Sequence, residues 1–372
     1  MIWNMYSQNM NANNQKRNKK KKRNFIFRGV SILCTIVFLV SGLCGCTAGG
    51  NREENLPKDQ KKLRVVTTIF PQYDFVRQIA GDNVSLTMLL KPGEETHSYE
   101  PTPQDIIAIQ NADLFIYVGG ENDEWVEDIL ESPEMEDVKR LRLVDCVGNI
   151  LAEEHVEGMK EERGHSHEDE EEESHDEEEH FLHSAEETEE EHNEHVHTMD
   201  EHVWTSPGNA IDIVEHITEE LCSLDSEHGQ TYKDNAEAYE TQLKELDTAF
   251  RDVVENAKNH TLLFGDRFPF RYFAAEYGLE YYAAFSGCAS DTEPSAATMA
   301  FLINKVKEEH IPVVLKMELS NDNIANAIAE ACDVPVKVFY SSHNISAKQF
   351  EAGVTYLDLM KENVETLKEA LR

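Results

Sequence analysis

The sequence predicts an α/β protein of two lobes, each built on a parallel sheet, joined by a long connecting helix. Short apolar runs alternate with helical patterns in both halves of the chain, which is typical of parallel sheets covered by helices. An extended amphipathic helical pattern separates the two halves. A chain of 372 residues is longer than a fold with one small hydrophobic core, and this length suits two domains.

The alternating elements can be assigned along the chain. In the first half we expect strands at residues 65–70, 84–90, 114–118 and 141–144, and helices at 104–112 and 124–130. The second half repeats the pattern, with strands expected at 261–265, 281–285, 312–317 and 336–340 and an amphipathic helix at 294–310. These assignments predict about four strands in each lobe.

The connecting region is expected to be helical over residues 207–260. Ser206 followed by Pro207 is a typical helix start, with serine as the N-cap and proline in the first turn. A break is expected near Ser226. The lobes then span 63–206 and 261–372, and a long helical connection between them favours a stiff clamp over a wide hinge.

The N-terminal 46 residues have the layout of a secretory signal, in which a basic block precedes a sixteen-residue apolar stretch at 29–44. That stretch is shorter than the roughly 20 residues that span a bilayer. Leu43-Cys44-Gly45-Cys46 resembles the lipobox of bacterial lipoproteins, which implies that Cys46 receives the lipid. An uncleaved anchor helix is the alternative. Either way, residues 47–62 form a flexible tether, and the folded part lies outside the cytoplasmic membrane.

The net charge of −38, from 72 acidic and 34 basic residues, excludes nucleic acid as a partner, since phosphate backbones require a basic surface. Much of it comes from residues 153–201, where 23 acids and two bases give 23 − 2, a net of −21. Such self-repelling runs predict a disordered loop, at 153–199.

The same loop is rich in histidine. Its members, apart from His155 near its start, are His165, His167, His175, His180, His183, His192, His195 and His197. Interleaved histidines and acids are a compositional signal of metal binding, although a solubilising charge run is the plainer interpretation. We favour an auxiliary metal-capturing loop.

Four cysteines remain beyond Cys46: Cys146, Cys222, Cys288 and Cys332. Their wide spacing is not that of a disulfide-stabilised scaffold. None of them forms a Cys-x-x-Cys pair, which argues against a metal site with thiolate ligands. A bridge between Cys288 and Cys332 stays open.

Ligand-type side chains follow several predicted strands, where the carboxyl ends of an open α/β sheet form a binding crevice. His97 follows the second strand, and His202 stands just ahead of the connecting helix. Asp266, Glu318 and His343 follow strands of the second lobe. Three imidazoles and two carboxylates would suit Zn²⁺, or Mn²⁺ at a higher coordination number.

Each candidate also has a structural alternative, and His202 could belong to the tail of the acidic loop. His97 could support the preceding turn, and Asp266 could pair with a neighbouring arginine, which is the favoured role for Asp266. Glu318 could cap the helix that follows it, and His343 could make an ordinary turn hydrogen bond.

Two long motifs resemble the substrate-binding lipoproteins of zinc and manganese ABC transporters. The first runs from Pro71 to Gly119 and includes His97 ahead of Tyr-Glu-Pro-Thr-Pro. The second, DPHVWLSPxNA in that family, stands here as DEHVWTSPGNA with His202 in the ligand position. The acidic, histidine-rich loop before it is typical of the zinc-specific branch. The resemblance spans residues 63–372 and implies His97 and His202 as the first two ligands.

The second lobe departs from the family pattern. The family has a histidine at the start of an HDAxxYF segment, whereas this chain reads GDRFPFRYF at 265–273. The resemblance therefore implies His343 as the third ligand, with Glu318, Asp266 and water competing for the fourth position.

The implied function is capture of one divalent metal, Zn²⁺ by preference, and its delivery to an ABC transporter permease by a monomeric, lipid-anchored binding protein that is not an enzyme. The same role for Mn²⁺ is the nearest alternative. A zinc hydrolase is disfavoured because no His-Glu-x-x-His motif is present. A metal-buffering or adhesin lipoprotein without a transporter stays open.

Overall fold

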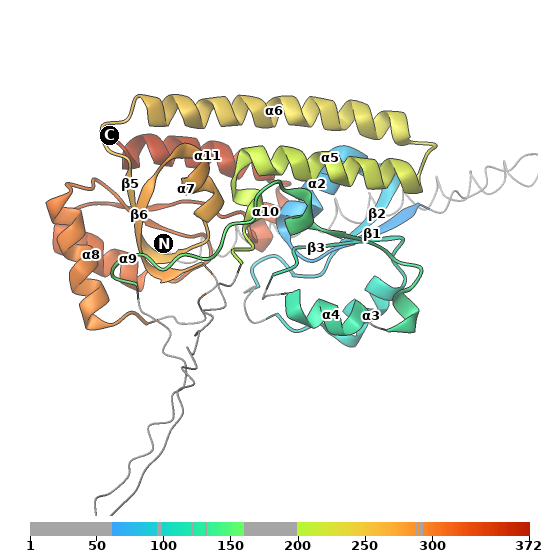
Figure 1. Cartoon of the computed structure of the whole chain (residues 1–372), viewed down its shortest axis with the longest axis horizontal. Coiled ribbons are helices and arrows are strands. Elements are labelled where there is room, and N and C mark those ends of the chain that lie inside the picture. Colours follow the sequence, from blue (N-terminus) through green and yellow to red (C-terminus); the bar gives the residue numbers. More distant parts are fainter. Residues whose placement is uncertain are drawn as a thin grey trace, which may run out of the picture. The chain divides into compact units, whose positions relative to one another are not determined.

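The computed structural model describes residues 62–94, 99–120, 123–130, 132–159, 199–287, 289 and 293–372. The signal, nearly all of the tether, His97, Cys288 and residues 160–198 of the acidic loop lie outside these ranges. Within them, the chain forms two four-stranded parallel sheets, ordered β2-β1-β3-β4 and β6-β5-β7-β8 (Figure 1). The prediction of two α/β lobes is confirmed. In this part of the chain, no helix combines the length and the hydropathy that a membrane crossing demands.

The first lobe is built around β1. Its strands are β1 (Leu63–Thr67), β2 (Val84–Met88), β3 (Leu114–Tyr117) and β4 (Lys139–Arg142), and its helices are α2 (Phe70–Ala80), α3 (Pro103–Gln110) and α4 (Glu124–Leu130). The sequence-based prediction extended the first strand to residue 70, but the strand ends at Thr67. The Gln72 side chain accepts the backbone N–H groups of Thr68 and Ile69, at 2.9 and 3.2 Å, and so starts α2 inside the apolar run.

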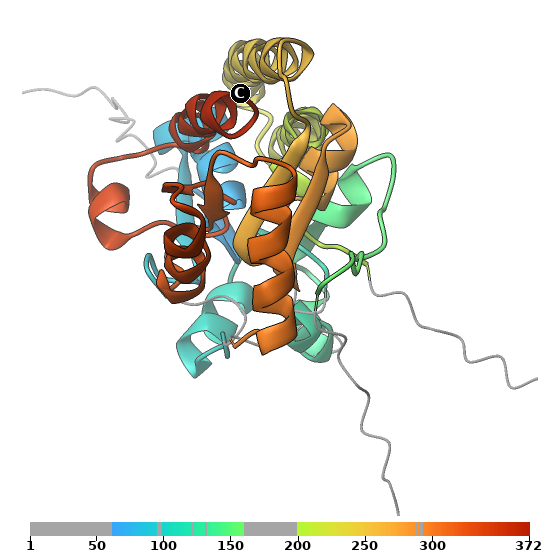
Figure 2. The same cartoon turned by 90° about the vertical axis from the view of Figure 1, so that its left-hand side faces the viewer.

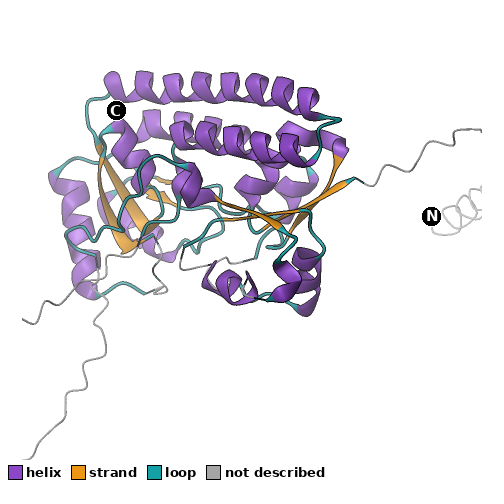
Figure 3. Ribbon diagram, turned by 45° about the vertical axis from the view of Figure 1, so that its right-hand side comes forward, coloured by secondary structure: helices purple, strands orange, loops and turns teal. Residues whose placement is uncertain are grey.

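The second lobe repeats the plan. Its strands are β5 (Thr261–Phe268), β6 (Glu280–Ser286), β7 (Val314–Lys316) and β8 (Val336–Val338), and its helices are α7 (Arg271–Tyr277), α8 (Ala296–Glu308), α9 (Asn323–Cys332), α10 (Ala347–Glu351) and α11 (Tyr356–Ala370). Strand β5 runs beyond the expected end at residue 265 through a register shift between Phe264 and Arg267. Helices lie against the strands of each sheet (Figure 3).

Two helices, not one, connect the lobes: α5 (Pro207–Leu224) and α6 (Gly229–Glu255). The Ser206 side chain accepts the N–H of Asn209 at 3.1 Å, as expected of an N-cap. The predicted break falls in the turn between the helices, where Asp225 accepts hydrogen bonds from His228 and Tyr232. Helix α6 lies along α5 and contacts both α2 and α11, so it touches the two lobes (Figures 1 and 2).

One apolar core runs through both lobes and the connecting helices. It contains fully buried aromatic side chains from each part, among them Phe75, Trp204, Phe250 and Phe339. A polar tie crosses the same region, since the buried Asp74 carboxylate on α2 accepts the N–H of Tyr356 on α11 at 2.7 Å. Opening the lobes would expose this shared core, which favours a stiff connection.

Candidate metal centre

His202 is the best-defined candidate ligand. It lies between the end of the acidic loop and the short turn Val203–Thr205 that leads into α5, and its side chain is fully buried. Nδ1 lies 3.1 Å from Oδ1 of Asp200, and the backbone N–H of His202 donates to the same oxygen at 2.9 Å. Nε2 is buried with no hydrogen-bond partner among the described residues. Asp200 thus orients the imidazole, as carboxylates orient metal-binding histidines in other proteins.

Two opposing effects set the proton affinity of His202. Burial lowers its pKa, but the carboxylate of Asp200 raises it, with help from Glu201, and the net direction is upward. A proton will therefore compete with a metal for Nε2 at a higher pH than for an unperturbed histidine.

His343 reaches the same place from the second lobe. It lies between β8 and α10 and is 8% exposed. Its ring centroid is 5.5 Å from that of His202 and 5.0 Å from that of Trp204. The His343 carbonyl accepts the N–H of Phe70 at 3.4 Å, which ties it to the start of α2. The structure thus brings together two of the predicted histidines, one ahead of the connecting helices and one from the second lobe.

A small cavity adjoins His343. Its lining combines backbone segments that follow β1, β2 and β3 with polar side chains: Thr68, Ile69, Leu90, Tyr99, Val118, Asp123, Glu201 and His343. The cavity therefore lies at the carboxyl ends of the strands, where open α/β sheets bind their ligands.

Two carboxylates in this lining were not selected from the sequence. Asp123, at the start of α4, accepts the N–H groups of Val118 and Gly119 through Oδ2, at 2.7 and 3.1 Å. Burial raises the pKa of Asp123 to about 7, partly offset by these hydrogen bonds and reinforced by the charge of Glu201. Glu201 is 1% exposed and lies against Gly120, where a β-carbon would overlap its carboxylate.

The sequence contained one signal for Glu201, which is a departure from the family motif. The motif DPHVW has proline at this position, whereas this chain has Glu201. Asp123 follows the end of β3 by a few residues, a position that also fits the strand-end rule.

The carboxylate of Asp266 accepts hydrogen bonds from nearby backbone N–H groups and a hydroxyl. Its Oδ1 accepts the N–H of Arg267 at 2.8 Å, and its Oδ2 accepts the N–H of Met317 at 3.0 Å and the Ser320 hydroxyl. It does not line the cavity. The sequence favoured a structural pairing of Asp266 with a neighbouring arginine; the partners found here are the backbone N–H of Arg267 and two groups of the turn after β7.

Glu318 supports the segment that carries His343. Its carboxylate accepts the backbone N–H and the hydroxyl of Ser341, at 2.7 and 2.8 Å. Burial raises the pKa of this carboxyl, against the effect of those hydrogen bonds. Like Asp266, it is absent from the cavity lining.

His97 and eight of the loop histidines lie outside the described residues, as does Cys288. The ends of the acidic segment are described, and they are paired: Ala152 and Met199 form an antiparallel bridge, and the N–H of Asp200 donates to Leu151 O at 2.9 Å. This pairing places Ala152 beside Met199, three residues ahead of His202. The thiol of Cys332 is free and donates to Ile303 O at 3.6 Å, and the suggested partner of a bridge, Cys288, lies outside the described residues.

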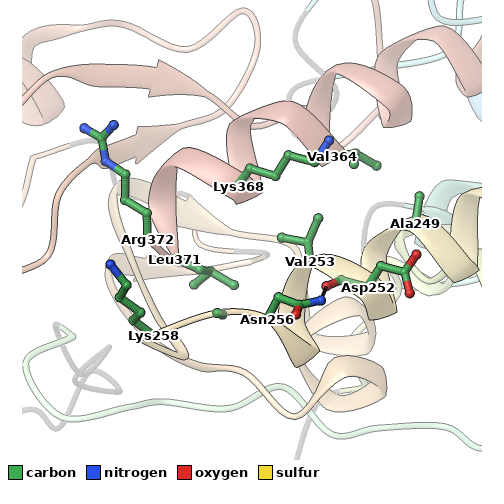
Figure 4. Close-up of a pocket in the computed structure, with 10 residues that line it drawn as sticks. Ala249, Asp252, Val253, Asn256, Lys258, Val364, Lys368, Leu371 and Arg372 are labelled. Atoms are coloured by element: carbon green, nitrogen blue, oxygen red, sulfur yellow. Dashed lines mark hydrogen bonds between the residues drawn. The ribbon is translucent and has the colours of Figure 1, made fainter.

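A separate groove of about 450 Å³ lies between the ends of α6 and α11 (Figure 4). Its lining has no histidine or cysteine and a single carboxylate side chain, that of Asp252, which makes it a poor metal site. In the part of the chain that is described, no three histidine, cysteine or acidic side chains already stand close enough to hold one ion.

Two parallel-sheet lobes, a stiff helical connection and buried imidazoles near the strand ends define a two-lobed solute-binding protein. The family model described as "Zinc-uptake complex component A periplasmic" matches residues 65–370, and the chain belongs to this family. The resemblance noted in the sequence is thereby confirmed.

Individual relatives agree. The high-affinity zinc uptake system protein ZnuA of Bacillus subtilis is 31% identical over 343 residues, which cover 90% of this chain and 94% of that protein. The zinc-binding lipoprotein AdcA of Streptococcus pneumoniae is 32% identical over 83% of this chain, but the match spans only 56% of its own length. These relatives carry names of zinc-binding and zinc-uptake proteins, not enzymes, in agreement with the prediction that this chain is not an enzyme.

Solved structures show the same fold. The Zn(II)-bound ZnuA-like domain of Streptococcus pneumoniae AdcA superposes with a TM-score of 0.63 at 28% identity, covering 83% of this chain and 99% of that domain. The metal-dependent lipoprotein YcdH of Bacillus subtilis gives a TM-score of 0.65 at 27% identity, with coverages of 83% and 99%.

Proposed function

We propose that this chain is an extracytoplasmic solute-binding lipoprotein that captures Zn²⁺ and delivers it to the permease of an ABC transporter. The observation that carries the proposal is the buried Nε2 of His202, which lacks a partner among the described residues and lies close to the ring of His343. The zinc-uptake family and the names of the relatives support zinc as the cargo.

The proposed ligand set begins with His202 and His343, whose ring centroids are 5.5 Å apart. His97 would complete a set of three imidazoles, a common zinc environment. Asp266 and Glu318 would act through the backbone segments they hold. Asp200 would keep the lone pair of His202 directed at the ion by accepting the proton on Nδ1.

The acidic loop would serve as a reservoir. Its base is held beside His202 by the Ala152–Met199 pair, so weakly bound ions would be held near the tight site. Tethered weak sites raise the local concentration of the ion without adding contacts to the tight site. Lipidation at Cys46 would keep the monomeric protein at the outer face of the membrane, within reach of the permease.

The proposal is tested by titrating the purified protein with Zn²⁺ and Mn²⁺ against a competing chelator. We expect one tight Zn²⁺ site, weaker binding of Mn²⁺, and loss of the tight site in His202→Ala. His216→Ala is the matched control, because His216 is an exposed histidine on α5. Tight Zn²⁺ binding that survives His202→Ala would contradict the proposal, and a clear preference for Mn²⁺ would reassign the cargo.

A further inference from the structure

The segment that follows β8 is hydrogen-bonded to the first lobe. The carbonyl oxygen of His343 accepts the N–H of Phe70, the first residue of α2, at 3.4 Å. The side-chain amide of the next residue, Asn344, donates to two carbonyl oxygens in the turn after β2, those of Lys91 and Glu94, each at 2.9 Å. Two neighbouring residues of the second lobe thus reach the first lobe through three hydrogen bonds.

The chemistry of this contact requires an amide. Nδ2 of Asn344 gives one hydrogen to each of the two carbonyl oxygens, and Oδ1 accepts the N–H of Ile345 at 2.8 Å. Both donors of the side chain and its acceptor are therefore used, and the residue is only 3% exposed. An aspartate has the same shape but no donor, so it would place a carboxylate against two carbonyl oxygens.

The turn that Asn344 holds has little other support from packing. Lys91, Gly93 and Glu94 are exposed. Within the turn, the N–H of Glu94 donates to the Lys91 carbonyl at 3.0 Å, and Gly93 has a φ of +88°, which favours glycine. Exposed residues gain little from burial, so the two bonds from the buried Asn344 amide are a main attachment of this turn to the fold.

The segment around Asn344 is itself firmly held. Ser342 is fully buried and has a φ of +60°, a backbone conformation that residues other than glycine seldom adopt. Such a conformation persists where the surroundings fix it on both sides. Here the carboxylate of Glu318 accepts the N–H of Ser341 on one side, and the Asn344 amide is bound on the other.

These bonds lie at the candidate metal centre. Leu90, directly ahead of the turn, lines the same small cavity as His343. In the sequence, His97 follows Glu94 by three residues, and Asn344 comes directly after His343. The Asn344 amide therefore sets the place from which the chain continues towards His97, relative to the segment that carries His343.

We propose that Asn344 is a positioning residue for zinc binding, whose side-chain amide holds the Lys91–Glu94 turn and thereby fixes the start of the segment that carries His97 with respect to His343. This inference rests on the proposed function, which takes both histidines as ligands. Asn344 does not contact the ion. It strengthens binding by reducing the conformational freedom that the ligand segment would otherwise lose when zinc binds.

The first test measures the zinc affinity of Asn344→Asp and Asn344→Ala by chelator competition. We expect both to bind about 10–100-fold more weakly, as is usual when a group that positions a metal ligand is lost. Asn344→Asp should lose more, because it adds a charge facing two carbonyl oxygens. Thermal melting shows whether each variant is folded, and Asn344→Ala carries the test if Asn344→Asp does not fold.

Asn235→Asp is the matched control. The half-buried Asn235 on α6 also donates to a backbone carbonyl of the first lobe, that of Ile79 at 2.8 Å, but neither residue lines the cavity. This variant should lose stability and keep its affinity for zinc. An equal loss of affinity in Asn235→Asp and Asn344→Asp would show a general effect of destabilisation and would overturn the inference.

A double-mutant cycle separates positioning of the His97 segment from a merely structural role. If Asn344 acts through the turn ahead of His97, Asn344→Ala should change zinc affinity by no more than about twofold in a protein that already carries His97→Ala, measured with a weaker chelator. A full loss in that background would place the effect elsewhere and overturn the inference.

The fate of the proposed function is read separately. If Asn344→Ala binds Zn²⁺ as tightly as the unmodified protein while His202→Ala does not, the inference is wrong and the proposed function stands. Unchanged affinity in His97→Ala alone would also overturn the inference. Absence of any tight site in the unmodified protein would overturn both proposals.

Discussion

The indole Nε1 of Trp204 donates a hydrogen bond of 2.8 Å to the carbonyl oxygen of Ser341. Trp204 lies two residues after His202, and Ser341 lies two residues before His343, so this bond fixes the spacing of the two candidate ligands. The Trp204 carbonyl in turn accepts the Tyr356 hydroxyl at 2.7 Å. All of these groups are buried, so the two histidines are placed by a rigid polar tie inside an apolar core.

Trp204→Phe should therefore destabilise the protein. The change keeps most of the ring but leaves the buried Ser341 carbonyl without its donor, which costs about 1–3 kcal/mol in the free energy of unfolding. Urea denaturation measures this loss. The matched control is Trp125→Phe, because the Trp125 Nε1 makes no hydrogen bond within the described residues and so none is lost. Equal losses in the two variants would show that the bond to Ser341 contributes nothing.

As the pH is lowered, the affinity for zinc should begin to fall at a higher pH than it does for a site built from unperturbed histidines. Zinc binds the neutral imidazole, and Asp200 raises the pKa of His202, so protons compete as the pH falls through a value above about 6.5. Asp200→Asn removes the charge that raises this pKa, and it should move the loss of affinity to lower pH. It should also weaken binding at pH 8 by about 10–100-fold, because the imidazole loses its orienting acceptor. Chelator competition between pH 5 and pH 8 gives both quantities. An unchanged pH profile in Asp200→Asn would contradict the role of Asp200.

Removal of residues 160–198 should leave the tight site intact. The Ala152–Met199 bridge holds the base of the segment, so the remaining residues can close as a short turn. Isothermal titration should show the tight site with unchanged affinity and the loss of several weaker sites. A tight site weakened tenfold or more would place one of its ligands in the deleted segment.

Gly120→Ala should disturb both stability and binding. The new methyl group would overlap the Glu201 side chain, and overpacking of this kind costs about 1–3 kcal/mol in the free energy of unfolding. Gly148→Ala is the control, since a β-carbon there meets nothing within 4 Å and should be neutral or slightly stabilising. Thermal melting and zinc titration of the two variants test the expectation. If Gly120→Ala melts and binds zinc like Gly148→Ala, Glu201 is not confined by this turn.

The strands were predictable from the sequence because their apolar runs are short and bounded by polar residues. The start of α2 was not, because Ile69 and Phe70 extend the apolar run into the helix, which is started by the side chain of Gln72. The helix expected to follow Glu318 is present as α9, which begins at Asn323.

Some residues of the candidate site could likewise be predicted from the sequence, and others could not. His202 and His343 could be found because each follows a strand or precedes a helix, and the structure brings them together. Glu201 and Asp123 could not be paired from the sequence, since their proximity depends on a turn at Gly120 that only tertiary packing places against Glu201. Likewise, nothing local to Asp266 revealed its bond to the N–H of Met317, 51 residues away.

The antiparallel pair of Ala152 and Met199 has a consequence for how this protein can diversify. A segment whose two ends are clamped can grow or shrink at small cost, because each doubling of the length of a flexible loop adds only about 0.6 kcal/mol of closure entropy. The proposed reservoir segment can therefore change in length or histidine content while His202, three residues past the Ala152–Met199 pair, keeps its place. Scavenging capacity and binding strength are then separately adjustable properties of one chain.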